Sequence, residues 1–192
     1  MKIAILDGNP NGANQALDRY LVELKDALSD TGHDVTLLML RDMDIEYCTG
    51  CFGCWVKTPG ECVARDDSAV VCRQMINSDF VLWTSPIIMG FASALLKKMV
   101  DKTIPLVHPY FVMDQGEYHH RARYERYPLF GTLWERRGDT DNRDIDIVND
   151  IFSRTALNFK SRLALTRLTS DPVDEVADEI NRLQWLPSRQ RG

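Results

Sequence analysis

Residues 2–15 read KIAILDGNPNGANQ, an apolar run that ends in a turn rich in glycine, asparagine and proline. An apolar run without strict alternation predicts a strand that is covered on both faces, as in a parallel sheet. Leucines recur at helical spacing directly after the turn: Leu17, Leu21, Leu24 and Leu28. We therefore expect a helix over residues 14–31, so that the chain begins as a strand, a turn and a helix.

The alternation of strands and helices continues along the chain. Apolar runs predict further strands over residues 33–40, 80–84, 128–134 and 162–168. Amphipathic stretches predict further helices over residues 67–77, 92–102, 144–159 and 172–185. This alternation is typical of an α/β fold in which helices cover both faces of a parallel sheet. We expect a doubly wound sheet of five strands in the order 2-1-3-4-5, with right-handed crossovers.

Length and charge limit the class of protein. The 192 residues, 44% of them hydrophobic, predict one globular domain over residues 1–192. The N-terminal run lacks the features of a signal peptide, and no apolar run approaches the roughly 20 residues of a membrane helix. We therefore expect a cytoplasmic protein with reduced thiols and no membrane association. A net charge of -5 argues against a nucleic-acid partner, which would need a clustered basic face.

Four of the five cysteines lie within residues 48–62, CTGCFGCWVKTPGEC. Three recur at spacings of three and a fourth follows, so that the set can turn toward one point: Cys48, Cys51, Cys54 and Cys62. Thiols in this pattern predict redox chemistry or a metal site, with an iron-sulfur cluster and a structural zinc as alternatives. Free cysteines packed in a compact turn are a third interpretation. Spacing alone does not choose the metal.

The helix expected after the cysteine loop begins near Asp66 and Asp67, which we interpret as capping residues. Cys72 falls inside this helix, beside Val71 and Met75, and its neighbours are those of a core position. We therefore expect Cys72 to take no part in the cysteine site.

Residues 106–127 fit no strand or helix and are rich in tyrosine, phenylalanine and histidine. We interpret them as an aromatic-rich insertion in the domain. A loop of this length is typically functional or disordered, and the aromatic content favours order. We expect an ordered lid or a subunit contact, and a homodimer, because aromatic side chains bury a large area at interfaces.

Three turns follow strands of the expected sheet, at residues 8–14, 85–90 and 134–138. The carboxyl ends of parallel strands meet at one edge, where doubly wound folds bind their ligands. The first turn opens a helix, so its backbone N–H groups can hold a phosphate while Gly8 and Gly12 permit close approach. Arg136 and Arg137 in the third turn can meet anionic phosphates or form a solvated turn. The three turns together predict one crevice.

The order of these motifs resembles that of the flavodoxin-like NAD(P)H-dependent FMN reductases, and among them the iron-sulfur flavoproteins. Three stretches within residues 1–105 carry the resemblance: GNPNGANQ, CTGCFGCWVKTPGECVARDD and SDFVLWTSPIIMGFASALLKKMVDK. Agreement across several elements is more specific than any one motif. The resemblance implies a flavodoxin-like fold, and it is thin beyond Pro105.

The resemblance implies that FMN is bound by two of the turns. Its phosphate would lie on the first turn, at Asn9, Asn11, Gly12, Ala13, Asn14 and Gln15. Its isoalloxazine ring would lie along the second turn and near the end of the fourth strand, at Ser85, Pro86, Ile87, Ile88, Met89, Gly90 and Trp134. The chain departs from the family pattern at Asn9, Gln15 and Ile88, where serine, threonine and an aromatic residue are usual, and its first turn lacks the family's arginine. Each lost donor would weaken phosphate binding by about 1 to 3 kcal/mol if nothing replaced it.

The resemblance also implies an activity, in which FMN accepts hydride from NAD(P)H and passes electrons to an unidentified acceptor. The flavin carries this chemistry, so we expect no catalytic side chain. The resemblance further implies that a cluster, held as a unit close to the flavin, is bound by Cys48, Cys51, Cys54 and Cys62. An iron-sulfur flavoprotein that serves a protein partner and a non-enzymatic flavodoxin-like carrier are the alternatives. The sequence leaves open the acceptor, the choice of NADH or NADPH, whether the cysteines bind a cluster, zinc or nothing, and whether the assembly is a dimer or a tetramer.

Overall fold

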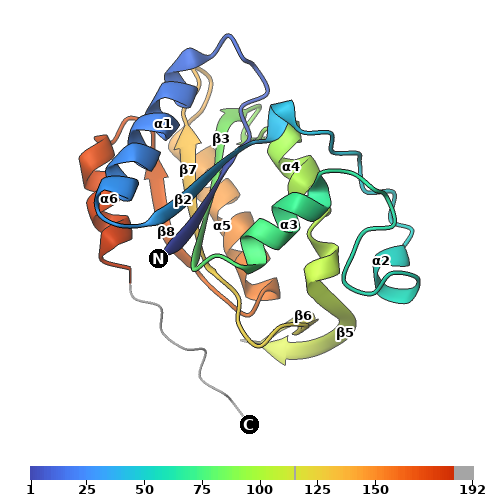
Figure 1. Cartoon of the computed structure of the whole chain (residues 1–192). Helices are drawn as coiled ribbons and strands as arrows, with labels where there is room; N and C mark the ends of the chain where they lie inside the picture. Colours follow the sequence, from blue (N-terminus) through green and yellow to red (C-terminus); the bar gives the residue numbers. More distant parts are fainter. Residues whose placement is uncertain (115, 184–192) are drawn as a thin grey trace.

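The computed structural model describes residues 1–114 and 116–183, and a mostly parallel sheet forms its centre (Figure 1). The parallel strands lie in the order β2-β1-β3-β7-β8, so the predicted order 2-1-3-4-5 and the α/β class are confirmed. These strands are β1 (Lys2–Asp7), β2 (Asp34–Met39), β3 (Phe80–Ile88), β7 (Leu129–Glu135) and β8 (Leu163–Leu168).

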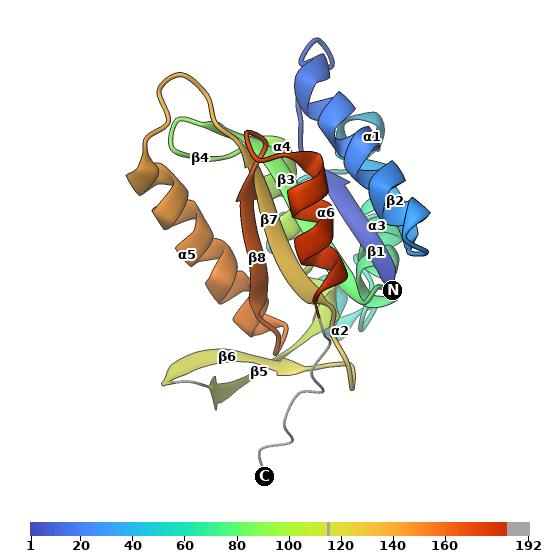
Figure 2. The same cartoon turned by 90° about the vertical axis from the view of Figure 1, so that its left-hand side faces the viewer.

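Helices cover both faces of the sheet (Figure 2). Helices α1 (Gln15–Asp30) and α6 (Val173–Asn181) pack on one face. Helices α3 (Ser68–Ile76), α4 (Ala94–Asp101) and α5 (Asn142–Asn158) pack on the other. Successive residues of β1 point to opposite faces, so Ile3 and Ile5 join the first layer while Ala4 and Leu6 join the second. The apolar start of the chain is buried on both faces for this reason.

The expected helices are present, with ends that differ by a few residues from the predicted bounds. Helix α6 ends at Asn181, and part of the stretch predicted to extend it to residue 185 lies outside the described residues. Three short helical turns join longer elements: η1 (Leu40–Asp42), α2 (Gly53–Val56) and η2 (Ile104–Leu106). The second of these lies inside the cysteine loop.

Strand β3 is longer than predicted, because it continues past Thr84 to Ile88. Met89 and Gly90 then form a two-residue turn with positive φ angles of 52° and 76°, and the chain returns as β4 (Phe91–Ala92) antiparallel to β3. Strand β1 ends opposite Thr84, so Pro86 lies where β3 no longer has β1 beside it. A proline costs little where one side of a strand is unpaired.

The aromatic insertion contains a β-hairpin, so the prediction that residues 106–127 form no regular element was wrong. Strands β5 (Val107–Asp114) and β6 (Glu117–Ala122) pair with each other and form a sheet of their own. Both views place this hairpin at the opposite end of the central sheet from the β3–β4 turn (Figures 1 and 2). The hairpin is therefore not a lid over the loops at that edge of its own chain, whereas a subunit contact stays a prediction.

Candidate functional site

Hydrogen bonds join the three predicted turns at the carboxyl edge of the sheet. Gly8 N–H donates to Thr84 O over 2.9 Å, and the Ser93 hydroxyl donates to Gly8 O over 2.5 Å. A Cβ on Gly8 would lie 2.6 Å from Leu96 Cβ and 2.7 Å from Thr84 O, so only glycine fits this close approach. The turns after β1 and β3 are therefore held together by the backbone and by the start of α4.

The first turn also bonds to the loop after β7. Asn14 occupies the N-cap position of α1, yet its side-chain amide donates to Glu135 Oε2 over 2.8 Å. Among the described residues, no side chain caps α1, whereas Ser93 caps α4 and Asp141 caps α5. The N–H groups at the start of α1 are thus free of a side-chain acceptor, which is the arrangement that binds an anion.

The expected phosphate residues of the first turn divide into an exposed set and one buried residue. The exposed or half-exposed residues are Asn11, Gly12, Ala13, Asn14 and Gln15. Asn9 is fully buried and shapes the turn instead. Its amide oxygen accepts from Asn11 N–H over 3.1 Å, and its amide nitrogen donates to Asn14 O over 3.1 Å.

A network of charged side chains that sequence reasoning missed lies beneath this turn. Arg41 binds both carboxylate oxygens of Asp18 at 3.0 and 2.8 Å, and its Nη1 lies 3.3 Å from Asp7 Oδ2. Burial raises the pKa of Asp7 to about 6, against the opposing effects of the Asn9 N–H group and Arg41. The only sequence signal was the charge of Asp7 at the end of an apolar run.

Arg41 also lies beside the turn itself. A Cβ on Gly12 would be 3.9 Å from Arg41 Nε. A guanidinium thus lies beside the turn, on η1 after β2, with both of its Nη atoms bound to Asp18. Arginine recognises phosphate well because its planar fork donates several N–H groups at once.

The second turn presents an apolar tip at the same edge. Ile88 and Met89 are 42% and 90% exposed, while Ser85, Pro86 and Ile87 are buried. The tip is an exposed surface of the kind against which a flat ring can pack.

Two neighbours fix the second turn. The Ser85 hydroxyl accepts from Ser93 N–H over 2.8 Å. Gly90 lies against the first turn of α5, where an added Cβ would be 2.8 Å from Asp144 Oδ1. The turn is thus held between the starts of α4 and α5.

Trp134, expected beside the ring, lies in the core. Its side chain is fully buried, its Nε1 donates to Asn149 Oδ1 over 2.8 Å, and its ring packs edge-on against Phe152. Residue 134 is the penultimate position of β7 and faces α5. The side chain therefore offers no exposed surface to a ligand at this edge.

The four clustered cysteines line a single cavity of about 280 Å³. Cys48 and Cys51 are exposed, and Cys54 and Cys62 are half-buried. Burial raises the pKa of Cys54, and the neighbouring thiols of Cys62, Cys48 and Cys51 raise it further. The thiol of Cys54 therefore lies close enough to the other three to be influenced by them.

Four thiols around one cavity are the donor types that a metal ion or a cluster needs. Among the residues that the structure describes, no three His, Cys, Asp or Glu side chains are close enough to hold one metal ion. Soft thiolates arranged around a larger space are the donor set of an iron-sulfur cluster. The four cysteines supply this type of donor, and they do not form a closed zinc site.

The backbone of the cysteine loop folds around this cavity. Gly50 and Phe52 have positive φ angles of 66° and 55°, which reverse the chain between Cys48 and Cys54. Gly53 is buried and lies against Val63. A Cβ at position 53 would lie only 2.4 Å from Val63 Cγ1, so a larger residue does not fit there. The two halves of the loop therefore close on each other.

A buried ion pair that was not expected lies beside the cavity, and Lys102 is its member at the cavity wall. Lys102 Nζ lies 2.7 Å from Asp66 Oδ2, and both side chains are at most 3% exposed. Burial would raise the pKa of Asp66, but hydrogen bonds from Lys102, Ser68 and the Glu46 N–H group outweigh it and hold the pKa at about 2. Asp66 does accept from Ser68 N–H, as a capping residue would, but it also fixes Lys102.

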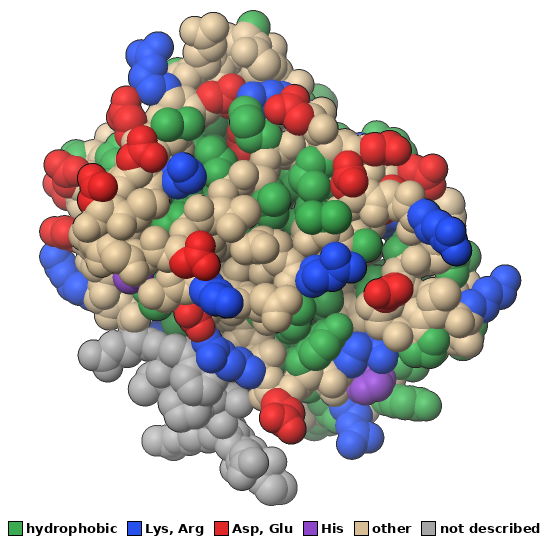
Figure 3. Space-filling view, viewed as in Figure 1, with side chains coloured by type: hydrophobic (Ala, Val, Ile, Leu, Met, Phe, Trp, Pro, Cys, Tyr) green, Lys and Arg blue, Asp and Glu red, His purple; other side chains and the backbone are tan. Residues whose placement is uncertain are grey.

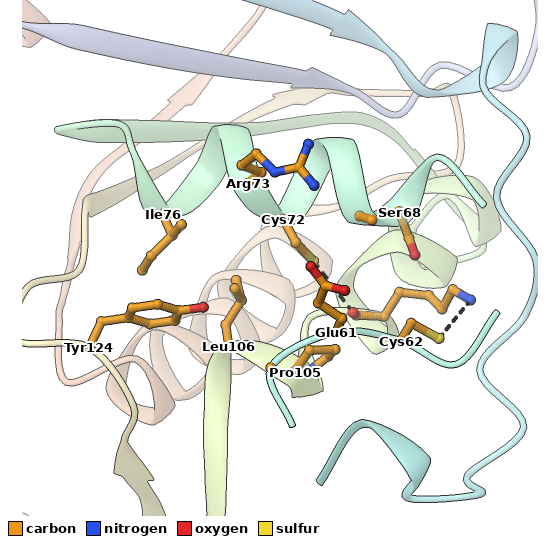
Figure 4. A pocket seen from close by; sticks show the side chains of 12 residues that line it. Glu61, Cys62, Ser68, Cys72, Arg73, Ile76, Pro105, Leu106 and Tyr124 are labelled. Atoms are coloured by element: carbon orange, nitrogen blue, oxygen red, sulfur yellow. Dashed lines mark hydrogen bonds between the residues drawn. The ribbon is translucent and has the colours of Figure 1, made fainter. Parts of the chain in front are cut away.

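A second cavity of about 110 Å³ shares Cys62, Lys102 and Pro105 with the first. Figure 4 shows Cys62 and Ser68 at one end of this cavity, with Ile76 and Tyr124 at the other. Cys72 lines the second cavity and not the first, and its thiol donates to Lys102 O over 3.5 Å. Cys72 is thus buried in the core, as predicted, and shares the second cavity with Cys62.

The cysteine cavity does not lie at the edge where the three turns meet. The turns contact the start of α4 through Ser93, whereas the cavity is lined by Asp101 and Lys102 at its end. The helix has 8 residues, so a rise of about 1.5 Å per residue makes it about 12 Å long. The closeness of the cysteines to the flavin stays a prediction.

Comparison with known proteins identifies the family. The model of the family described as NADPH-dependent FMN reductase matches residues 1–121. This chain belongs to that family. In this FMN reductase family member, the matched region contains the first two turns and the whole cysteine loop.

Two curated relatives are similar over the same region. The chain is 34% identical over 111 residues to an iron-sulfur flavoprotein of Archaeoglobus fulgidus, and the match covers 56% of this chain and 48% of that protein. It is 31% identical over 108 residues to an iron-sulfur flavoprotein of Methanocaldococcus jannaschii, with 55% and 53% covered. The chain thus spans about half the length of the curated relatives it matches.

A solved structure shares the fold. The FMN-dependent NADH-azoreductase from Bacillus anthracis, solved in complex with FMN, superposes with a TM-score of 0.63 at 11% identity. The match covers 93% of this chain and 98% of the azoreductase. In the described part of this FMN reductase family member, no helix is both long enough and apolar enough to cross a bilayer.

Proposed function

We propose that this protein is an FMN-dependent oxidoreductase that takes hydride from NAD(P)H. This chain belongs to the FMN reductase family, and one structural observation gives the proposal its main support. The N-terminus of α1 has no side-chain cap and opens at the edge where three turns meet. A phosphate held there needs little net positive charge from the protein, because backbone N–H groups and the helix dipole stabilise it.

The residues of this edge fit FMN. The uncapped N–H groups at the start of α1 and the guanidinium of Arg41 would hold its phosphate, while the tip formed by Ile88 and Met89 would pack on its ring. Bound FMN would supply the redox chemistry, by exchanging hydride with a nicotinamide and releasing electrons singly or in pairs. The protein's own part is to bind and orient the ring and to exclude water from one of its faces.

The third turn is the proposed contact for the nicotinamide nucleotide. Arg136 and Arg137 are exposed there, and they are held by Asn142 and Glu135 at 2.7 and 3.2 Å. Guanidinium groups beside the flavin edge would meet the phosphates of NADH or NADPH. The physiological acceptor and the preferred nucleotide are left to experiment.

A second redox centre is favoured by the cysteine cavity. We infer that Cys48, Cys51, Cys54 and Cys62 hold an iron-sulfur cluster, because they line one space and the curated relatives are iron-sulfur flavoproteins. A cluster would supply one-electron transfer, which makes a redox protein partner the proposed acceptor.

The five cysteines are free thiols, which supports a reducing cytoplasmic location.

The proposed assembly is a homodimer that uses the hairpin. Tyr110, Phe111, Met113 and Tyr118 are between 65% and 73% exposed on β5 and β6. Figure 3 shows hydrophobic side chains among acidic and basic ones across the face seen in Figure 1. A two-stranded sheet is marginal alone, so burial of these side chains against a second copy would stabilise it.

The visible absorption spectrum of anaerobically purified protein tests both centres. We expect flavin bands, with an additional broad absorption where a cluster is present. Addition of NADH or NADPH should bleach the flavin bands, and the faster nucleotide is the preferred one. Flavin that is bound but never bleached by either nucleotide would favour the non-enzymatic carrier, and protein without flavin bands would contradict the proposal.

A further inference from the structure

Lys102 is a buried cation with two partners. One of them is Cys62, a member of the cysteine centre, by which we mean Cys48, Cys51, Cys54 and Cys62 with the group they are proposed to bind. The residue is 2% exposed, and its ammonium contacts Asp66 Oδ2 at 2.7 Å and Cys62 Sγ at 3.4 Å. The dashed line from Cys62 in Figure 4 marks the second contact. Burying an ammonium costs several kcal/mol unless good partners compensate, so a surface lysine would be the default.

Both ends of Lys102 are held in place. Asp66 accepts hydrogen bonds from Ser68 and from Glu46 N–H, which fix the carboxylate that binds the ammonium. Lys102 is the C-cap residue of α4, and its N–H donates to Met99 O and Val100 O. The ammonium therefore has little freedom to leave the sulfur atom.

We propose that Lys102 is a positioning residue for the cysteine centre: held by Asp66, it donates a hydrogen bond to Cys62 and raises the reduction potential of the cluster bound there. The inference rests on the proposed cluster. Reduction adds negative charge to the cluster, so a nearby cation and an N–H···S hydrogen bond stabilise the reduced form more than the oxidised form.

The role is specific to one of the four cysteines. Lys102 lines the shared wall of the two cavities, on the side of Cys62. Cys51 is instead influenced by the N–H group of Gly53, which lowers its pKa. The positive charge is thus placed at one corner of the centre, where the loop returns toward α3.

The experiment compares midpoint potentials in anaerobically reconstituted protein. Lys102→Met removes the charge and the hydrogen bond, whereas Lys102→Arg keeps the charge. Lys97→Met is the matched control, because Lys97 pairs with Asp101 on the same helix with both side chains more than 40% exposed. Iron and FMN contents are measured for each variant, and the cluster and flavin potentials are followed by redox titration with optical and electron paramagnetic resonance detection.

We expect Lys102→Met to shift the cluster potential to more negative values and leave the flavin potential unchanged. Lys102→Arg and Lys97→Met should stay near the parent protein. Loss of iron in Lys102→Met with retention in Lys102→Arg would also support the role, because arginine keeps the charge and the N–H donors that methionine lacks. An unchanged cluster potential in Lys102→Met with full iron content would overturn it.

Asp66→Asn is a second test variant, which is needed if Lys102→Met does not fold. It keeps the ammonium and removes the negative charge that balances it, so we expect a shift of the cluster potential to more positive values. A potential equal to that of the parent in iron-loaded Asp66→Asn would overturn the proposal when Lys102→Met does not fold. Absence of iron from the reconstituted parent protein would overturn the cluster itself, a failure that is distinct from an unshifted potential in an iron-loaded variant.

Discussion

The side-chain amide of Asn14 donates to the carboxylate of Glu135 over 2.8 Å, although 121 positions separate the two residues. This bond joins the turn after β1 to the loop after β7 and draws Asn14 away from capping its own helix. The pair thereby fixes the shape of the candidate phosphate site from outside it.

Asn14→Ala should therefore weaken FMN binding. A hydrogen bond to a charged group contributes about 1.5 to 3 kcal/mol, so we expect a Kd at least about tenfold higher. Quenching of flavin fluorescence on titration into apoprotein measures it. Glu135→Gln keeps an acceptor for Asn14 and serves as the control with a smaller effect. An unchanged Kd in Asn14→Ala would place the phosphate elsewhere.

Gly12→Glu should abolish or strongly reduce FMN binding by placing a carboxylate in the phosphate turn. Gly12→Ala is the matched control, because an added Cβ finds its nearest heavy atom 3.9 Å away, at Arg41 Nε. Riboflavin, which lacks the phosphate, should bind the glutamate variant as weakly as it binds the parent. Equal losses for FMN and riboflavin would indicate a misfolded loop rather than phosphate repulsion.

Asp7 should make the apoprotein less stable as the pH rises from about 4 to about 6. Its pKa is raised from 3.8 to about 6, so the folded state holds this proton more tightly than the unfolded state. The free energy of unfolding then falls by on the order of 3 kcal/mol across that window and is constant above it.

Asp7→Asn should remove this pH dependence, because asparagine keeps an oxygen for the Asn9 N–H group without a titrating proton. Urea denaturation of both proteins between pH 4 and pH 8 gives the difference in the free energy of unfolding. A difference that does not vary with pH would show that Asp7 is ionised throughout this range.

Tyr118→Ser and Phe111→Ser should shift the proposed dimer toward monomer, because each removes an exposed aromatic side chain from the hairpin. Light scattering at several protein concentrations measures the assembly. Tyr47→Ser is the control, since Tyr47 is 73% exposed, as is Tyr118, but lies in the cysteine loop. A parent protein that is monomeric with FMN bound would contradict the hairpin interface.

Single serine substitutions should separate the four cavity cysteines from the fifth. Cys48→Ser, Cys51→Ser, Cys54→Ser and Cys62→Ser should each lower iron content and leave FMN bound, because the cavity lies apart from the flavin turns. Cys72→Ser should change neither, since Cys72 does not line the cavity that the other four share. Iron analysis after anaerobic reconstitution measures the effect, and equal iron content in all five variants would exclude a cysteine-bound cluster.

The central sheet could be predicted from sequence because its signals are local. Each apolar run and its following amphipathic helix lie within a short stretch, and β1 to α1 is the clearest case. The hairpin was missed because Tyr110 and Phe111 are exposed, and because its support comes from Trp55, whose Nε1 donates to Val107 O over 3.0 Å. That contact depends on the tertiary fold.

The same reason explains what was missed at the candidate sites. Arg41 lies 23 positions from Asp18, and Lys102 lies 40 positions from Cys62, so neither pair leaves a pattern that can be recognised by spacing. The cysteine spacing did predict one shared cavity. Its distance from the flavin turns could not be predicted, since it depends on the direction of α4.

Helix α4 has a consequence for electron flow between the two proposed centres. Ser93 at its start holds the turn that would bind flavin, and Lys102 at its end holds Cys62. Tunnelling rates depend on both distance and driving force. Between the two proposed centres, the backbone of α4 would help to fix the distance within one chain, while Lys102 at its end would tune the driving force. Mutations at Lys102 should therefore tune the rate without moving either centre.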